Sequence, residues 1–190
     1  MIDLEKLSEQ KHVFRFFSNH LSYPETDPFV GERLEDVIPP THPSYLYVKR
    51  YYDEMYEHKL YTLRTKYIET FDFQKDTTLY MTYIKFEDSK ERGQMLARLK
   101  VLYEMFGLYM PDGELSDYLP LMCEFIFAAD WQGDSRAEQS FSLLLAVLED
   151  GSYHLMKALE KHDSPFLHLV KGMRETFKVC IVQEGVGAND

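Results

Sequence analysis

The stretch from Tyr118 to Ala129 constrains the fold most, because it is apolar on almost every side of a helix. A helix of this kind is stable when other helices surround it, so we expect it in the middle of a helical bundle. Either Ser116 or Asp117 could cap its N-terminus. The chain has no run of about 18 apolar residues, so the sequence predicts no membrane-spanning helix. The apolar positions of this stretch are Leu119, Leu121, Met122, Phe125, Ile126 and Phe127.

Apolar residues recur at helical spacing along nearly the whole chain, and no long segment alternates as a half-buried strand does. We expect Ser89 to cap one helix and Gly107 to end it, and Gly151 to start another after a break. The sequence therefore predicts a single all-α domain over residues 1–182, a bundle of about eight or nine helices, with 183–190 as a flexible tail. The expected helices cover about 4–21, 28–38, 43–69, 76–86, 89–106 and 118–129, one around 141–148, one from 151 and one over 165–179.

The two cysteines, Cys123 and Cys180, do not form a CxxC pair, and Cys123 lies in an apolar run. A disulfide or a cysteine-based metal site is therefore not expected. The N-terminus is charged and lacks the apolar stretch of a signal peptide. Both features favour the reducing cytoplasm.

The net charge of −11 disfavours nucleic acid as a partner, because phosphates would be repelled. The acidity is concentrated, since residues 101–150 hold ten acids and one base, Arg136. Such a one-sided stretch predicts attraction for a cationic partner. The alternative is a solvated acidic face that serves solubility alone.

Motifs that carry chemistry are few. Glu9 and His12 form the one Glu-x-x-His pair among seven histidines, whereas a di-iron bundle needs two such pairs. The sequence has no HExxH, GxxxxGK[ST] or GxSxG motif. We therefore expect no catalytic residue and no metal site, and the balance favours a binding protein.

Residues 114–125, ELSDYLPLMCEF, resemble the signature E-x-x-D-[HY]-L-P-x-x-x-E-[FY] of the NarJ family, within the TorD-like redox-enzyme maturation chaperones. Residues 103–108 resemble that family's YE-x-FGL, 21–25 its LSYPD turn, and 71–73 with 78–80 its FD…S-L-Y segment. The matches run in the family's order and spacing from about residue 21 to 125. Position 118 is Tyr where many relatives carry His, so a role that needs an imidazole there would not apply.

The resemblance implies a TorD/NarJ-like helical chaperone with no enzymatic activity. It would bind the N-terminal segment of the catalytic alpha subunit of apo nitrate reductase. It would support insertion of bis-molybdopterin guanine dinucleotide into that partner, without binding the cofactor stably, before the complex docks at the membrane. A monomer or weak dimer is expected. Competing hypotheses are a helical adaptor for another basic peptide, and an enzyme or metal carrier with an unfamiliar site.

The partner segment implied by the resemblance is similar to a twin-arginine leader, a short amphipathic helix that carries arginines. A site for it needs apolar pockets and carboxylates. We expect Asp117 as the central carboxylate, with Glu114 and Glu124 nearby. Glu124 lies seven residues beyond Asp117, which is two helical turns, so these two can face one side. Tyr118 could stack on an arginine or pack in the core, and Asp117 could instead act as a helix cap. Leu121 and Phe125 are the expected apolar contacts.

Overall fold

The computed structural model describes residues 2–181, so the expected tail at 183–190 lies outside the described residues. The all-α prediction is confirmed for the described part, where two isolated β-bridges are the only extended pairing. The helices are α1 (Leu4–Glu9), α2 (Lys11–Leu21), α3 (Leu34–Val37), α4 (Tyr45–Met55), α5 (Leu60–Phe71), the 3-10 helix η1 (Lys75–Thr77), α6 (Tyr83–Phe86), α7 (Lys90–Met105), α8 (Leu119–Ala128), α9 (Ala137–Lys161) and α10 (Phe166–Val179).

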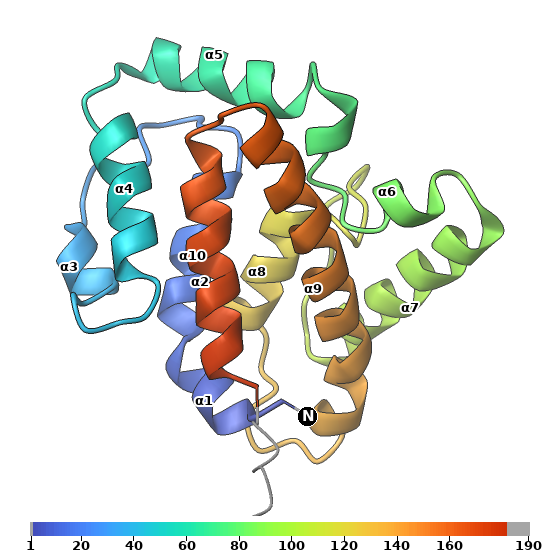
Figure 1. The fold of residues 1–190 in the computed structure, drawn as a ribbon. Helices are drawn as coiled ribbons and strands as arrows, with labels where there is room; N and C mark the ends of the chain where they lie inside the picture. The colour runs from blue at the N-terminus through green and yellow to red at the C-terminus, as the bar shows by residue number, and fades with distance from the viewer. Residues whose placement is uncertain (1, 182–190) are drawn as a thin grey trace, which may run out of the picture.

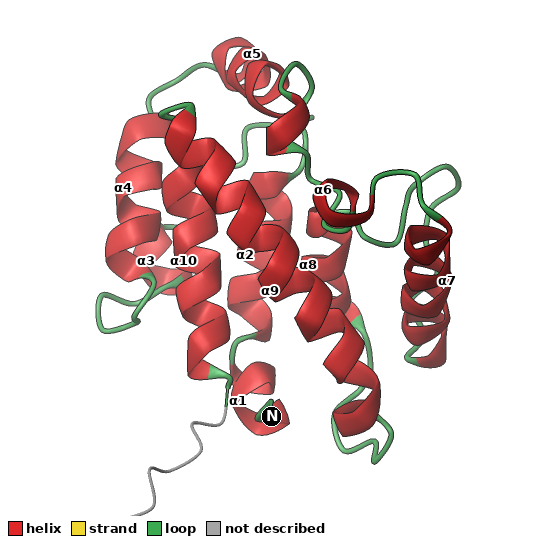
Figure 2. Cartoon of the chain, turned by 45° about the vertical axis from the view of Figure 1, so that its right-hand side comes forward, coloured by secondary structure: helices red, strands yellow, loops and turns green. Residues whose placement is uncertain are grey.

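Helix α8 lies inside the bundle, as its composition predicts. It packs against α2, while α10 packs against α4 and α9 (Figure 1). Met122, Phe125 and Ile126 have no exposed surface, so α8 contributes all of its turns to the core. Helix α5 crosses one end of the bundle, and the pair α6 and α7 stands to the side of it (Figure 2). Among the described residues, no helix combines the length and hydropathy that a membrane span requires.

Two predicted long helices are each divided in the structure. The expected helix 4–21 turns at Gln10, whose side-chain Oε1 lies 2.9 Å from Nε2 of His42. The expected helix 43–69 ends at Met55 and resumes at Leu60, because α5 leaves the direction of α4 to cover the end of the bundle (Figure 1). Neither break contains Pro or Gly, the residues that usually mark the end of a helix in a sequence. The helical spacing of apolar residues continues through both breaks, so the sequence predicts one helix in each case.

The predicted helix from residue 28 is also wrong over most of its length. Asp27 was expected to cap that helix, but its Oδ1 accepts a hydrogen bond of 2.9 Å from the backbone N–H of Phe29, which makes a local turn. Gly31 then adopts a φ of 113°, and α3 is short. The expected helix 76–86 is likewise reduced to η1 and α6.

The start of α7 follows the prediction, because Oγ of Ser89 accepts a hydrogen bond of 3.2 Å from the N–H of Arg92. Gly107 follows that helix with a φ of 83°, as expected of a left-handed terminator. A break at Gly151 was also predicted, and this prediction is wrong: α9 runs through it without interruption. Gly151 instead lets α9 approach the backbone of Met81 closely.

The substitution Gly151→Ala is expected to destabilise the protein by about 1–3 kcal/mol, because the new Cβ would lie 2.5 Å from the carbonyl oxygen of Met81. Gly93→Ala in α7 is the matched control, since its Cβ would meet no atom within 4 Å. That control should gain about 0.5–1 kcal/mol from helix propensity. Urea unfolding of the two variants tests the difference, and equal stabilities would contradict the close approach.

Burial of His20 is expected to make the fold sensitive to acid. The ring stacks on Phe16 at 4.0 Å, and burial lowers the pKa of His20 to about 3. Since an unfolded histidine titrates near pH 6.5, the unfolded chain binds the extra proton and stability falls below that pH. The loss at pH 5 should reach about 2 kcal/mol. In His20→Gln this loss should largely disappear, whereas His12→Gln, at an exposed position, should retain it.

Candidate functional site

The signature residues 114–125 begin in the loop before α8 and continue into it. The backbone of this loop pairs with the segment before α6: Met81 N–H donates to the carbonyl of Asp117 at 2.9 Å, and Leu119 N–H donates to that of Leu79 at 2.8 Å. This short antiparallel bridge sets Tyr80 opposite Tyr118. Two segments that are about 40 residues apart in sequence therefore form the site together.

Asp117 is completely buried beneath this bridge. Its Oδ2 accepts hydrogen bonds from the backbone N–H of Thr82 at 3.0 Å and from the hydroxyl of Thr82 at 2.5 Å. Nη2 of Arg92 lies 3.3 Å from the same oxygen, and that side chain is 10% exposed. Asp117 thus joins α7 and the segment before α6 to the start of α8.

The alternative that Asp117 caps α8 is wrong. Tyr118 occupies the N-cap position, and no side chain caps this helix. The carboxylate turns instead toward a guanidinium and two donors of Thr82, which together stabilise its charge more than one capping hydrogen bond would. Its other oxygen, Oδ1, has no hydrogen-bond partner among the described residues.

The accessible part of the site is formed by Glu114, Tyr80 and Tyr118, which we call the tyrosine surface; the exposed ring of Tyr23 lies beyond it, 5.7 Å from that of Tyr67. The ring of Tyr118 lies 5.4 Å from that of Tyr80, whose hydroxyl donates to Oε1 of Glu114 at 3.1 Å. The hydroxyl of Tyr118 lies 3.2 Å from that of Tyr67, which donates to the carbonyl of Leu21. These bonds fix the rings while leaving Glu114, Tyr80 and Tyr118 partly exposed.

The electrostatics of the tyrosine surface favour a cation. Burial and the nearby Glu114 raise the pKa of Tyr80 to about 12. Burial is also the main cause that raises the pKa of Tyr118, with Glu114 and Asp72 adding to it. The phenols therefore remain protonated, and the carboxylates hold a negative potential beside aromatic faces. Guanidinium and ammonium groups bind such faces.

The remaining predicted residues do not share this surface. Glu124 is exposed on α8, whereas Asp117 is buried before that helix begins. The expectation that the two carboxylates face one side is therefore wrong, because helical spacing does not extend to Asp117. Leu121 is 5% exposed and Phe125 is fully buried, with its ring 4.7 Å from that of Tyr103. In this structure both side chains belong to the core.

The residues not predicted for the site are Arg92, Thr82, Tyr80 and Tyr67, whose hydroxyl lies beside that of Tyr118. Tyr80 stands inside a segment that resembles the NarJ family, and this signal could have led to it. Arg92 lies in the first turn of α7, where an arginine is typical of a solvated surface. Nothing in its local sequence indicates burial.

The site was expected to combine apolar pockets with carboxylates, but residues 114–125 line none of the cavities found among the described residues. A cavity of about 480 Å³ opens between α9 and α10, and none of its lining residues belongs to 114–125. We call it the α9–α10 groove. It is lined by Ile2, Glu138, Ser142, Leu145, Ala146, Glu149, Asp150, Ser152, Arg174, Phe177, Lys178 and Ile181.

Among the described residues, no group of three or more histidine, cysteine or acidic side chains could hold a metal ion. The described residues form an all-α domain whose signature loop has partly exposed tyrosines beside an acid, Glu114.

The chain belongs to the nitrate reductase delta subunit family, whose model matches residues 34–171. This confirms the resemblance drawn from the motifs. The Bacillus subtilis protein named "Probable nitrate reductase molybdenum cofactor assembly chaperone NarJ" is 37% identical over 120 residues, which are 63% of this chain and 61% of that protein. The Mycobacterium tuberculosis "Nitrate reductase-like protein NarX" is 29% identical over 115 residues, 60% of this chain and 17% of that protein. The match thus spans about three fifths of one relative and under one fifth of the other.

Proposed function

We propose that this protein is an assembly chaperone without enzymatic activity, which binds the N-terminal segment of the catalytic alpha subunit of nitrate reductase. Membership of the delta subunit family and the name of the Bacillus relative support the nitrate reductase partner. The observation that carries the binding role is the tyrosine surface, where Glu114 lies among partly exposed rings. The partner would be held there until its molybdenum cofactor is inserted, before membrane docking.

Recognition at this surface would rest on arginine side chains of the partner segment. A guanidinium can stack on Tyr118 or Tyr80 while donating hydrogen bonds to Glu114. Among the described residues, Glu114 forms no ion pair with a base of this chain, so its charge is available to a ligand. Glu124, exposed on α8, remains a proposed outer contact. We assign Asp117 a positioning role, because its carboxylate is enclosed by Thr82 and Arg92.

The cofactor itself is assigned to the partner. Bis-molybdopterin guanine dinucleotide carries phosphate groups, which the carboxylate of Glu114 on the tyrosine surface would repel. The protein would therefore act on a partner that takes up the cofactor and would not store it. A cytoplasmic location and a monomeric or weakly dimeric state belong to the same proposal.

Calorimetric titration with a synthetic N-terminal segment of the nitrate reductase alpha subunit tests the proposal. We expect micromolar or tighter binding that weakens as salt is added, because exposed charges are screened. Glu114→Gln should weaken binding several-fold, and Tyr118→Ala should do so by a similar factor. Glu57→Gln is the matched control, since Glu57 is an exposed acid in the α4–α5 connection.

Two outcomes would count against the proposal. If the titration at low salt gives no heat of binding, the proposed chaperone role is contradicted. Equal binding of a scrambled peptide with the same composition would favour the alternative, a helical adaptor that accepts any basic peptide. That alternative rests on the acidic stretch 101–150, which attracts cations without selecting a sequence.

A further inference from the structure

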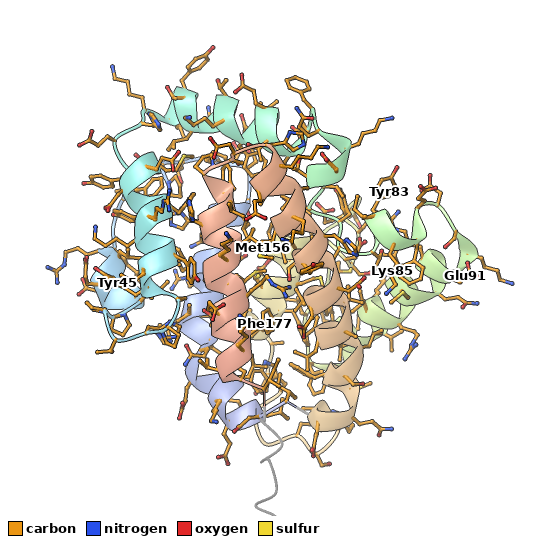
Figure 3. The ribbon with its side chains drawn as sticks, in the orientation of Figure 1. Tyr45, Tyr83, Lys85, Glu91, Met156 and Phe177 are labelled. Atoms are coloured by element: carbon orange, nitrogen blue, oxygen red, sulfur yellow. The ribbon has the colours of Figure 1, made fainter. Side chains whose placement is uncertain are left out.

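Helix α7 carries a separate candidate surface. It stands beside the bundle with α6 (Figure 2), and Glu91 in its first turn lies at the outer edge of the molecule (Figure 3). One face of the helix is apolar and accessible: Val101 is 57% exposed and Met105 is 38% exposed, and Ala97 is exposed one turn before Val101. Apolar side chains that gather on an accessible helix face are typical of a contact with another chain.

This face of α7 forms one wall of a groove of about 360 Å³, which we call the α7–α9 groove. The other wall belongs to the N-terminal part of α9, where Ser142 and Leu143 line the groove. Small side chains stand on both walls, Ala97 on α7 and Ser142 on α9. They permit a helix of another chain to reach the 8–10 Å axial separation of packed helices. The groove therefore has room for one more helix.

The order of side chains along α7 favours a second copy of the same helix as the occupant. In an antiparallel pair with a two-fold axis beside Val101, residues at equal distances before and after Val101 lie at the same level on the two helices. Ala97 then lies at the level of Met105 of the partner subunit, so a large side chain covers a small one. Arg98 lies at the level of Glu104 of the partner subunit, and the symmetry repeats each contact.

Both charged groups are available for this contact. Arg98 is exposed and forms no ion pair among the described residues. Glu104 lies 4.0 Å from Lys100, and because both side chains are about half exposed, this pair contributes little. A parallel pair of helices would place each charge at the level of its own copy, where like charges repel. The charge pattern therefore selects the antiparallel pair.

We propose that two copies of this protein associate through α7, antiparallel about a two-fold axis at Val101, with α7 of each copy in the α7–α9 groove of the other. The 16 residues of α7 span roughly 24 Å, so the contact falls at the small end of protein interfaces, about 1,200 Å² or less. We expect a dimer that dissociates on dilution, with a dissociation constant on the order of 100 μM. The proposal goes beyond the proposed function, which leaves the surface of a weak dimer open, and it does not depend on nitrate reductase.

Sedimentation equilibrium of the full chain, without any peptide, tests the proposal. Between about 10 μM and 1 mM protein we expect a transition from monomer to dimer. Val101→Glu brings two like charges together at the axis and should weaken association about ten-fold or more. Val30→Glu is the matched control, because Val30 is 77% exposed in the loop before α3, and this variant should associate as the unchanged chain does.

Charge reversal tests the antiparallel register. Arg98→Glu and Glu104→Arg should each weaken association several-fold at low salt, and the double variant with both substitutions should associate as the unchanged chain does. A mixture of the two single variants should form a mixed dimer, because every facing pair is then opposite in charge. Both positions are exposed, so far-UV helicity should stay the same in all of these variants.

The proposal is overturned if the chain remains monomeric at about 1 mM, or if Val101→Glu associates as Val30→Glu does. It is also overturned if the double charge reversal fails to restore association. Since this test contains no nitrate reductase segment, its failure leaves the proposed function standing. Titration of that segment against Glu114→Gln tests the proposed function separately.

Discussion

Arg92→Ala is expected to lower the free energy of unfolding by about 3–5 kcal/mol, the cost of leaving one partner of a buried ion pair alone. Arg92 donates from Nε to the hydroxyl of Thr82 at 3.0 Å and lies 3.3 Å from Oδ2 of Asp117. The substitution leaves the fully buried carboxylate of Asp117 without a charged partner. Chemical denaturation of the two proteins at pH 7 measures the difference.

Arg98→Ala provides the matched control on the same helix, since Arg98 is exposed and should change stability by about 0.5 kcal/mol or less. The double variant Arg92→Met with Asp117→Leu should recover much of the loss, because it removes both buried charges together. A loss below about 1 kcal/mol for Arg92→Ala would mean that the pair is solvated in solution.

Phe125→Ala is the second large expected effect, a destabilisation of about 3–5 kcal/mol from the lost burial and the cavity left behind. The ring of Phe125 is fully buried, 4.7 Å from Tyr103 and 5.5 Å from Phe141. Phe125→Leu should cost less than about 1.5 kcal/mol, because much of the volume is kept. Thermal and urea unfolding give both values.

The Phe125 variants distinguish a role in the core from a role in contacting the peptide. Phe73→Ala is the control, since Phe73 is 73% exposed and its removal should change stability by about 0.5 kcal/mol or less. Phe125→Leu should bind the nitrate reductase segment as the unchanged chain does. If Phe125→Leu stays stable but loses that binding, the original expectation that Phe125 touches peptide would be restored.

The sequence predicted those parts of the fold that depend on local pattern. Helix α8 is buried because it is apolar all round, and α7 begins at Ser89 because a hydroxyl there satisfies a free backbone N–H. Where the apolar period continues through a bend, as between Met55 and Leu60, pattern alone predicts one helix. At Gly151 the sequence predicted a helix break where the structure has none. Glycine is required there because α9 passes close to Met81, and not because the helix ends.

The sequence indicated which segment carries the candidate site, but it did not indicate which of its side chains are buried. The signature segment led to Glu114 and Tyr118, which are accessible, and to Asp117, which is enclosed. Whether a carboxylate is buried depends on side chains from other segments that contact it. Arg92 precedes Asp117 by 25 residues, and no helical or strand period connects such positions.

Hydrogen exchange of the backbone amides, with and without the nitrate reductase N-terminal segment, tests most directly whether the tyrosine surface holds the partner. Bound peptide should slow exchange at residues 79–82 and 114–118, which pair across the bridge beside Tyr80 and Tyr118. Slowed exchange elsewhere, with these two segments unchanged under saturating peptide, would contradict the account.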